Sequence, residues 1–437
     1  MLPAGMIDLE PKQLALRKHI FNIAEKCFTL RGAKQIETPA IELLSTVTNL
    51  YGEEFDKLVY TLDQDAEDET KQKLIMRYDL TVPLARYIGS NGLKSLKRFQ
   101  IGKVYRRDTP QIQKGRYREF YQCDFDIVGN DDGSYIYDLE MLETLHDILD
   151  QLLNCKKIII KLNHREIVNN ILTYAHVPVD KIQTVCSTLD KLDKKTWSEI
   201  STELTDKKIS IDCITILKDL MLELFDKTNN DKLKILIDKN ILSDSALNNM
   251  MTIMSFINLM SYDNFILEPF LIRGMDYYTG IIYEAQYIDL SVMPFTIAAG
   301  GRYDDMMEKF CNVGKLPSIG MSLGIERIAK ILEQTFEMTE IKYDVYIASI
   351  GKNMAPYKIQ IASELRKHNI VSTMSHMNDQ KMRHQMDIVF EKKIPIMIIV
   401  GSSELETNTV TIKNISTKTQ FNVPYKLMIE TVKLHLN

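Results

Sequence analysis

Apolar residues recur with a helical period at the start of the chain and with a period of two farther along. In residues 11–30 they keep the spacing of an amphipathic helix, and Gly32 is a typical stop signal just behind it. In residues 97–129 apolar and polar positions alternate in two runs, which a polar stretch at 108–118 separates. This region is predicted to form an antiparallel hairpin with a long, charged loop.

The pattern up to residue 336 indicates a mixed sheet that a helical segment interrupts. A helix is predicted at 138–153 and a short buried strand at 156–162. Residues 163–262 are helical in period and rich in Lys, Asp, Asn and Leu, which indicates a helical insertion. Strand-like runs return at 265–272, 280–287 and 298–303, and a strand leads into a helix at 318–332.

The C-terminal part follows a charged linker at 337–342 and alternates between strand and helix. Strands are predicted at 345–349, 370–374 and 396–400, and a helix at 356–368, which is typical of a small α/β domain. The expected division is a sheet domain in two parts, 1–162 and 263–336, an insertion at 163–262 and a terminal domain at 343–437.

Composition places the chain among folded, globular proteins of more than one domain, with 437 residues, 45% of them hydrophobic and 26% charged. No apolar stretch is long enough to cross a bilayer, and the N-terminus lacks a basic segment followed by an apolar run, so a cytoplasmic protein without a membrane anchor is expected. The cysteines are scattered without a Cys-x-x-Cys pair, so neither a zinc site nor a disulfide framework is predicted. They are Cys27, Cys123, Cys155, Cys186, Cys213 and Cys311.

The charge is unevenly distributed, although the chain as a whole carries −5. From Tyr343 onward, 12 Lys and Arg stand against 8 Asp and Glu, which leaves +4 there and −9 on the preceding part. A mildly basic terminal domain on an acidic body is compatible with RNA contact. An ordinary solvated surface would give the same pattern, so both interpretations stay open.

Polar side chains gather on one face of the predicted hairpin, where a buried sheet would carry apolar ones. Gln122, Asp124 and Asp126 share a face because alternate residues of a strand point the same way. A solvated face with ordinary ion pairs is the alternative. The hairpin also carries arginines that could hold a polyphosphate, because each guanidinium can bind two oxygens in its plane. They are Arg106, Arg107, Arg116 and Arg118.

Three later segments concentrate further polar and glycine residues: RGMDYYTG at 273–280, AAGGRYDD at 298–305 and GMSLGIERI at 320–328. Paired glycines permit close approach of the backbone to a ligand, and Arg327 falls in the first turn of the helix that follows the third segment. The glycine-rich phosphate and dinucleotide loops, the nucleophile elbow and the zinc-protease motif are all missing from the sequence. ATP, if bound, must therefore be held by arginines.

These segments carry a resemblance. YRRD with GRYREFYQCDFD and GIERI resemble the second and third motifs of class II aminoacyl-tRNA synthetases, and RGMDYYTG, GGRYDD and MRYDLTVPLARY (residues 76–87) resemble elements of the eukaryotic-type histidyl-tRNA synthetases. The resemblance implies an α+β and α/β multidomain protein: an antiparallel-sheet catalytic domain with a helical insertion, and a C-terminal α/β anticodon-binding domain. It also implies a homodimer that activates L-histidine with ATP and transfers it to the 3′ end of tRNA(His).

The resemblance also implies roles for individual residues. Arg106 and Arg273 would be catalytic, and Mg²⁺ would be bound with ATP rather than by a dedicated protein site. The residues implied for ATP are Arg106, Asp108, Arg116, Phe120 and Arg327. Those implied for histidine are Asp79, Thr81, Arg106, Gln122, Asp126, Arg273, Tyr277, Tyr278 and Tyr303.

Physical chemistry agrees with these roles. Attack of a carboxylate on the α-phosphorus needs no general base, so catalysis rests on positioning and on charge neutralisation by Arg106, Arg273 and Mg²⁺. Selection of an imidazole needs an acceptor for one ring N–H and a hydrogen-bonding group at the other nitrogen, which Asp126 and Tyr278 provide.

One feature departs from the family pattern, and one alternative function competes. PAGMID at residues 3–8 stands where the family has a Lys-Gly-Thr-Arg-Asp type of sequence. PAGMID contains no arginine, which puts in doubt any local role of the family's arginine in this chain. The alternative is a catalytically inactive paralogue that regulates histidine biosynthesis or senses tRNA. Such a protein is expected to lose RGMDYYTG or the arginines, whereas this chain keeps Arg106, Arg116, Arg273 and Arg327.

Overall fold

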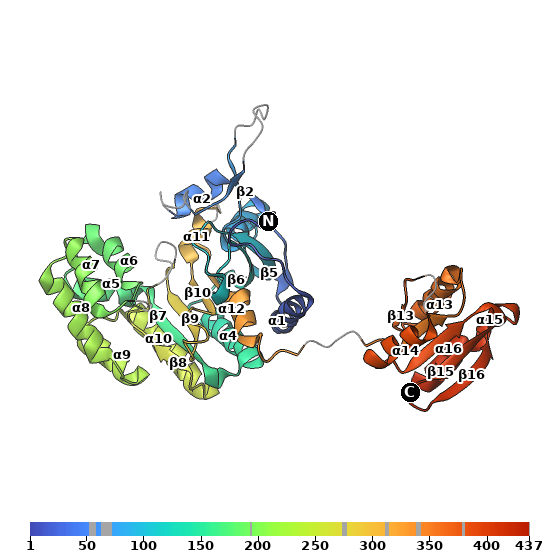
Figure 1. The fold of residues 1–437 in the computed structure, drawn as a ribbon. Coiled ribbons are helices and arrows are strands. Elements are labelled where there is room, and N and C mark those ends of the chain that lie inside the picture. Colours follow the sequence, from blue (N-terminus) through green and yellow to red (C-terminus); the bar gives the residue numbers. More distant parts are fainter. Residues whose placement is uncertain are drawn as a thin grey trace. The chain divides into compact units, whose positions relative to one another are not determined.

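The computed structural model describes residues 1–51, 58–62, 72–192, 195–272, 278–310, 314–337, 342–377 and 381–436. The chain forms two compact units, Met1–Phe336 and Glu337–Asn437. Figure 1 shows the elements of both. None of the described helices is both long enough and apolar enough to span a bilayer.

An eight-stranded sheet is the centre of the first unit, in the order β1-β5-β6-β11-β10-β9-β7-β8. The strands are β1 (Lys34–Gln35), β5 (Leu96–Tyr105), β6 (Glu119–Val128), β7 (Ile158–His164), β8 (Phe265–Leu267), β9 (Ile281–Tyr287), β10 (Ala298–Arg302) and β11 (Ser318–Gly324). Neighbours are antiparallel except for β1–β5 and β7–β8. The predicted antiparallel sheet is thus confirmed, and β5 and β6 are the predicted hairpin.

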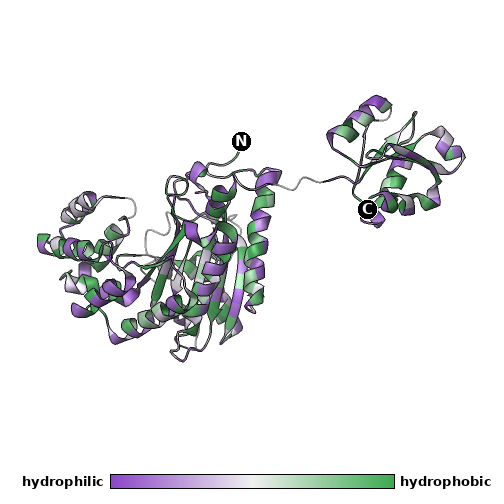
Figure 2. Ribbon diagram, turned by 90° about the horizontal axis from the view of Figure 1, so that it is seen from below, coloured by the Kyte–Doolittle hydropathy of each residue, from purple (hydrophilic) through white to green (hydrophobic). Residues whose placement is uncertain are grey.

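Three helices cover one face of this sheet: α1 (Pro11–Leu30), α4 (Ile136–Leu153) and α12 (Ile325–Leu332). The apolar residues of the hairpin point to that face, where Phe28 of α1 stacks on Phe125 with ring centroids 5.0 Å apart. Many helices of the molecule are hydrophilic on one side and hydrophobic on the other (Figure 2). The fold therefore follows from burying these apolar helix faces against alternate residues of the strands.

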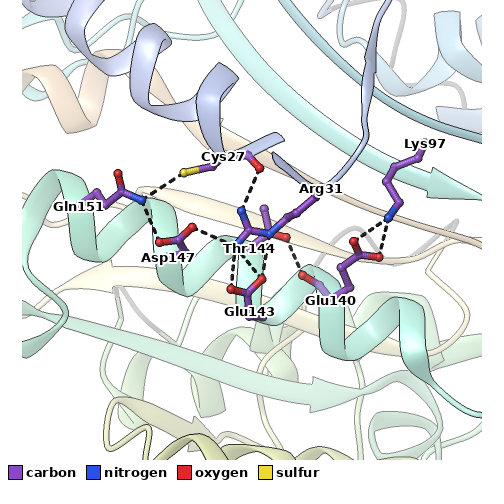
Figure 3. Close-up of polar contacts among 8 residues, drawn as sticks. All are labelled: Cys27, Arg31, Lys97, Glu140, Glu143, Thr144, Asp147 and Gln151. Atoms are coloured by element: carbon purple, nitrogen blue, oxygen red, sulfur yellow. Dashed lines mark hydrogen bonds and ion pairs between the residues drawn. The ribbon is translucent and has the colours of Figure 1, made fainter. Parts of the chain in front are cut away.

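Charged groups join α1 to α4 beside this core. The Arg31 guanidinium, directly after α1, lies between the carbonyl oxygen of Cys27 and two carboxylates of α4 (Figure 3). It donates to Glu143 at 2.6–2.8 Å and to Asp147 at 2.9 Å. Burial, followed by the nearby Asp147 carboxylate, raises the pKa of the Cys27 thiol to about 11. That thiol is therefore protonated at neutral pH.

The smaller elements of this unit lie before and beside the large sheet. A three-stranded sheet consists of β2 (Ile41–Leu43), β4 (Leu74–Met76) and β3 (Thr61–Leu62). The further helices are α2 (Leu44–Tyr51), α3 (Thr81–Asn91) and α11 (Asp304–Glu308). The sequence pattern predicted none of these, and the strands among them have only two or three residues, too few to show a period.

In the sequence, six α-helices of the described residues follow β7 and precede β8, although these two parallel strands are neighbours in the sheet. Of these helices, α6 to α9 gather in one bundle (Figure 1). The six are α5 (Arg165–Tyr174), α6 (Ile182–Leu189), α7 (Trp197–Asp206), α8 (Ile211–Leu224), α9 (Asn229–Asp238) and α10 (Asp244–Met260). Four of them begin behind a Ser or Thr whose hydroxyl accepts a hydrogen bond from a backbone N–H of the first turn: Thr196, Ser210, Thr228 and Ser243.

Three elements of this unit have predicted bounds that are wrong by two residues or more, and the first is the strand predicted at 156–162, which is found at Ile158–His164. The strand predicted at 265–272 ends at Leu267, because Pro269 follows shortly and lacks the N–H that a strand needs. The helix predicted at 138–153 begins two residues earlier, at Ile136, after Tyr135 in the left-handed region with φ 58°.

His164 ends β7 and caps α5 with its Nδ1, which accepts a hydrogen bond from the backbone N–H of Glu166 at 3.2 Å. Burial lowers the pKa of His164 from 6.5 to about 4. Because the unfolded chain takes up this proton first, stability is lost as the pH falls from about 6.5 to about 4. The shift corresponds to roughly 3 kcal/mol.

His164→Asn is expected to keep the cap and to make this acid destabilisation shallower. Urea unfolding between pH 7 and pH 4 tests this through the fluorescence of Trp197, the single tryptophan, which lies in α7 of the same unit. Parallel loss of stability in both proteins would contradict the role of His164.

The second unit is a five-stranded sheet in the order β13-β12-β14-β15-β16. Its strands are β12 (Val345–Ser349), β13 (Ser372–Met374), β14 (Ile396–Val400), β15 (Thr409–Asn414) and β16 (Thr419–Pro424), and its helices are α13 (Ala355–Lys367), α14 (Met382–Glu391), α15 (Ser402–Glu406) and α16 (Met428–Leu436). One core joins Val345 and Ile347 to α13 and α16, and another joins Tyr346 to α14. Helices therefore cover both faces of this sheet.

Candidate active site

The second face of the large sheet is polar near its centre, and strand register decides which groups meet there. Asp126 of β6 lies between Arg98 of β5 and Gly320 of β11. One row along, Asp124 lies between Gln100 and Ser322. Side chains with the same parity share a face, so this row forms a polar floor opposite the helix-covered core.

A pocket of about 570 Å³ opens on this floor. Eleven predicted site residues line it: Asp79, Thr81, Arg106, Asp108, Arg116, Phe120, Gln122, Asp126, Tyr278, Tyr303 and Arg327. The other two, Arg273 and Tyr277, lie outside the described residues. Segments that are far apart in the sequence thus meet in one cavity.

Arg106 stands just past the end of β5, where aromatic rings and a backbone carbonyl hold it. Its Nε donates to the carbonyl oxygen of Tyr78 at 3.1 Å, and its guanidinium lies 4.2 Å from the ring centroid of Tyr78 and 5.2 Å from that of Phe120. Its backbone N–H donates to the carbonyl oxygen of Arg118, and this hydrogen bond joins the two ends of the hairpin loop. The cation is therefore fixed in the pocket wall before any ligand binds.

The hairpin loop brings a second arginine to the pocket. The Arg116 guanidinium pairs with Asp108 at 2.8 Å, and Gly115 before it has φ 69° and packs against the backbone of Glu326 at the start of α12. Arg107, by contrast, is exposed, and Arg118 donates to the carbonyl oxygens of Asp108 and Ala4. The structure thus brings two of the four hairpin arginines to the pocket.

Arg327 enters the pocket from the first turn of α12. It donates to the carbonyl oxygen of Thr296, and its guanidinium lies 5.3 Å from the ring centroid of Phe295. Phe120 lines the same pocket, so flat apolar and cationic surfaces are available for a planar base. The sequence analysis did not single out Phe295, and no motif marks it.

Asp126 is a deeply buried carboxylate of the pocket, only 2% exposed. The Tyr303 hydroxyl donates to its Oδ1, and the Arg98 guanidinium lies 2.7 Å from its Oδ2. Burial raises the pKa of Asp126, and the positive charge of Arg98 opposes this shift. For the neighbouring Asp124, burial raises the pKa to about 7, again against the effect of Arg98.

Other polar groups complete this end of the pocket. Asp79 accepts a hydrogen bond from the backbone N–H of Val82 at 3.1 Å, so its carboxylate sits at the N-terminus of α3, which begins at Thr81. Gln122 donates to the Ser322 hydroxyl at 3.1 Å. These groups present donors and acceptors beside the buried carboxylates.

Glycines make room for these side chains. A Cβ on Gly320 would lie 2.0 Å from Oδ1 of Asp126, and one on Gly301 would lie 2.9 Å from the ring of Tyr278. Glycines of AAGGRYDD and GMSLG therefore let the strand backbone approach the pocket side chains, whereas the sequence predicted a close approach of the paired glycines to a ligand.

A buried ion-pair network holds the strand that leads to Tyr303. The Arg302 guanidinium pairs with Asp131 at 2.7 Å and with Asp138 of α4. The carbonyl oxygen of Arg302 accepts from the backbone N–H of Thr279, next to Tyr278. The position of both pocket tyrosines thus depends on Arg302, which the sequence analysis quoted within a motif but gave no role.

No three His, Cys, Asp or Glu side chains come together as a metal site in the described part of the chain. The five described cysteines are free and buried. The lining of the pocket offers arginines, carboxylates, hydroxyls and aromatic rings.

Comparison with known proteins gives the family. The family model for histidyl-tRNA synthetase matches residues 5–328, and the model for an anticodon binding domain matches residues 344–435. The histidine–tRNA ligase of Danio rerio is 35% identical over 98% of this chain and 88% of its own length, and the cytoplasmic one of Dictyostelium discoideum is 37% identical over 96% and 88%. A histidyl-tRNA synthetase crystal structure from Nostoc sp. PCC 7120 has the same fold, with a TM-score of 0.73, 22% identity and 99% of both chains covered. The chain belongs to the histidyl-tRNA synthetase family.

Proposed function

We propose that this chain is a histidine–tRNA ligase, which forms histidyl-adenylate from L-histidine and ATP in this pocket and then esterifies histidine to the 3′ end of tRNA(His). One observation carries the proposal: a single pocket joins arginines suited to phosphates, aromatic and guanidinium surfaces suited to adenine, and a buried carboxylate suited to an imidazole.

Adenylate formation requires the histidine carboxylate to attack the α-phosphorus while pyrophosphate leaves. Arg106 neutralises charge on the α-phosphate and orients the attacking carboxylate, and Arg116 holds the outer phosphates. Arg273 would add a second cation at the reacting phosphorus. Mg²⁺ bound together with ATP would supply further positive charge. No group of this chain has to take up a proton from the nucleophile, because the carboxylate is already an anion.

Histidine is selected at the other end of the pocket. Asp79, Thr81 and Gln122 bind the α-ammonium group. Asp126 accepts a hydrogen bond from one imidazole N–H, and the Tyr278 hydroxyl serves the other nitrogen. An amino acid without these ring nitrogens would leave buried polar groups unpaired, which can reject it by roughly 10⁴-fold or more without an editing step.

The test is histidine-dependent exchange of labelled pyrophosphate into ATP. We expect exchange with L-histidine and only background exchange with the other amino acids. A folded protein that binds histidine without exchange would instead be the inactive regulatory paralogue. Charging of tRNA(His), followed by acid precipitation of labelled histidine, tests the second step.

The second unit is proposed to bind the anticodon end of the tRNA. Its net charge of +4 from Tyr343 onward and its match to the anticodon-binding family model support this. Ending the chain at Phe336 should leave pyrophosphate exchange close to the full-length rate, because the pocket and its core lie within Met1–Phe336.

The same truncation should lower the efficiency of tRNA charging by at least about 100-fold, because the tRNA loses one of two linked contacts. Both rates are measured on one preparation, so that exchange serves as the control for folding. Equal damage to the two steps would contradict a tRNA-binding role.

We further propose a cytoplasmic homodimer. The Dictyostelium relative is named cytoplasmic, whereas a Mus musculus relative is named mitochondrial, so cell fractionation tests the compartment. Sedimentation equilibrium tests the dimer: the measured mass should be twice the chain mass of 50.5 kDa.

A further inference from the structure

We propose that Arg98 is a positioning residue that sets the specificity for histidine. It ties the imidazole end of the pocket to the ammonium end, and its positive charge favours the ionised form of Asp126, the form that accepts a hydrogen bond from a neutral imidazole. The inference rests on the proposed function, since it concerns the same pocket.

The first support is geometric. Arg98 is completely buried, and it lies opposite Asp126 on the neighbouring strand. Its Nη2 is 2.7 Å from Oδ2 of Asp126 and donates to the carbonyl oxygen of Leu80 at 3.0 Å. Leu80 stands directly between Asp79 and Thr81. One guanidinium therefore spans the two groups of residues that would hold opposite ends of the amino acid.

The second support is electrostatic. Groups from several elements face Asp126: Arg98 from β5, Asp124 from β6, Asp79 before α3, Tyr303 after β10 and Tyr283 from β9. Burial and the Asp79 carboxylate favour the protonated form of Asp126, and the hydrogen bond from the Tyr303 hydroxyl favours the ionised form. Arg98 is the cation that opposes the effect of burial, for Asp124 as well as for Asp126.

The third support is the unfavourable position of Arg98 itself. Within the described part of the chain its Nε and Nη1 are buried without a hydrogen-bond partner. Burying such donors costs free energy, and an apolar residue of similar size would serve the stability of a sheet better. An arginine at this place is therefore explained by the pocket rather than by the core.

The charge state of Asp126 matters because only a carboxylate is purely an acceptor. An ionised Asp126 can accept a hydrogen bond from an imidazole N–H while the Tyr303 hydroxyl donates to the same group. A protonated Asp126 would itself carry a donor and would favour a different ring partner. Arg98 thus acts on the substrate through Asp126, which is what distinguishes a positioning residue from a catalytic one.

Arg98→Met and Arg98→Lys test this inference in the pyrophosphate-exchange assay. The measured quantities are KM for histidine, KM for ATP, and the dependence of kcat/KM for histidine on pH between 6 and 8.5. Arg98→Met should raise KM for histidine by about 10- to 100-fold, with little change for ATP. It should also move the acidic limb of the profile upward by about one pH unit, because the pKa of Asp126 rises when the cation is lost.

Arg98→Lys keeps the charge but cannot reach both partners as a planar fork. It should leave the acidic limb near its wild-type position while KM for histidine still rises. Arg31→Met is the matched control, because it removes a largely buried, ion-paired arginine that joins the end of α1 to α4 and is not part of the pocket lining (Figure 3). This variant should lower the unfolding midpoint and leave both KM for histidine and the pH profile unchanged.

The inference is overturned if folded Arg98→Met keeps the wild-type KM for histidine and the wild-type acidic limb, or if histidine and ATP are affected equally without a pH shift. If Arg98→Met does not fold, Arg98→Lys decides: a shifted acidic limb in this charge-preserving variant overturns the inference. Calorimetric titration of wild type and variants with L-histidine separates failure of this inference from failure of the proposed ligase function. Wild type that binds histidine without exchange contradicts the ligase function alone, and the same binding series then still tests Arg98.

Discussion

Arg106→Ala is expected to lower the rate of histidyl-adenylate formation by about 100- to 1,000-fold. Arg106 is held rigid by the Tyr78 carbonyl oxygen and by the rings of Tyr78 and Phe120, so its charge needs no reorganisation when negative charge builds on the α-phosphate. The effect should therefore fall on kcat more than on KM for histidine, because neutralisation matters most in the transition state.

Single-turnover formation of the adenylate measures this rate directly. Arg107→Ala is the matched control, because Arg107 is the adjacent arginine and is exposed. Arg107 is not part of the pocket lining, so its removal leaves the walls of the pocket intact. We expect this control to react at nearly the wild-type rate. A loss in Arg106→Ala that appears only as weaker histidine binding would exclude the proposed role at the phosphate, and an equal loss in both variants would indicate a general charge effect.

The part of the fold that the sequence predicts well is the part whose periodicity is strong and local. The helix at Pro11–Leu30 and the hairpin of β5 and β6 have long, regular patterns, and both are found with nearly the predicted bounds. The strands β15 and β16 were not predicted, although they pair with each other over six residues. In β16 only Phe421 and Val423 are partly buried and the other four residues are exposed, so its apolar period is weak.

The pocket was predictable as far as its residues belong to recognisable motifs. Asp126, Tyr303 and Arg327 were assigned because of their sequence neighbours, and the structure brings them to one cavity. Arg98 lies in the first strand of the predicted hairpin, but nothing in that strand shows which residue faces it on β6. That partnership depends on cross-strand register, which two chain segments determine together and neither reveals alone.

The second large effect is expected for Gly320→Ala. A Cβ at this position would lie 2.0 Å from Oδ1 and 2.8 Å from Cγ of Asp126, and 3.0 Å from the Tyr303 hydroxyl. Asp126 cannot simply rotate away, because Arg98 and Tyr303 both hold it. We expect kcat/KM for histidine to fall by at least about 100-fold, since displacement breaks the buried charge contacts of the carboxylate.

The effect of Gly320→Ala should be specific to the amino acid, because the clash involves the imidazole end of the pocket and leaves Arg106, Arg116 and Arg327 in place. KM for ATP, measured in the same exchange assay, should therefore stay close to the wild-type value. Gly133→Ala provides the control: with φ 82° and no atom within 4 Å of the added Cβ, it costs about 1 kcal/mol of backbone strain without touching the pocket. Normal histidine kinetics in a folded Gly320→Ala would mean that Asp126 can move without consequence, and it could then not be the group that selects the imidazole.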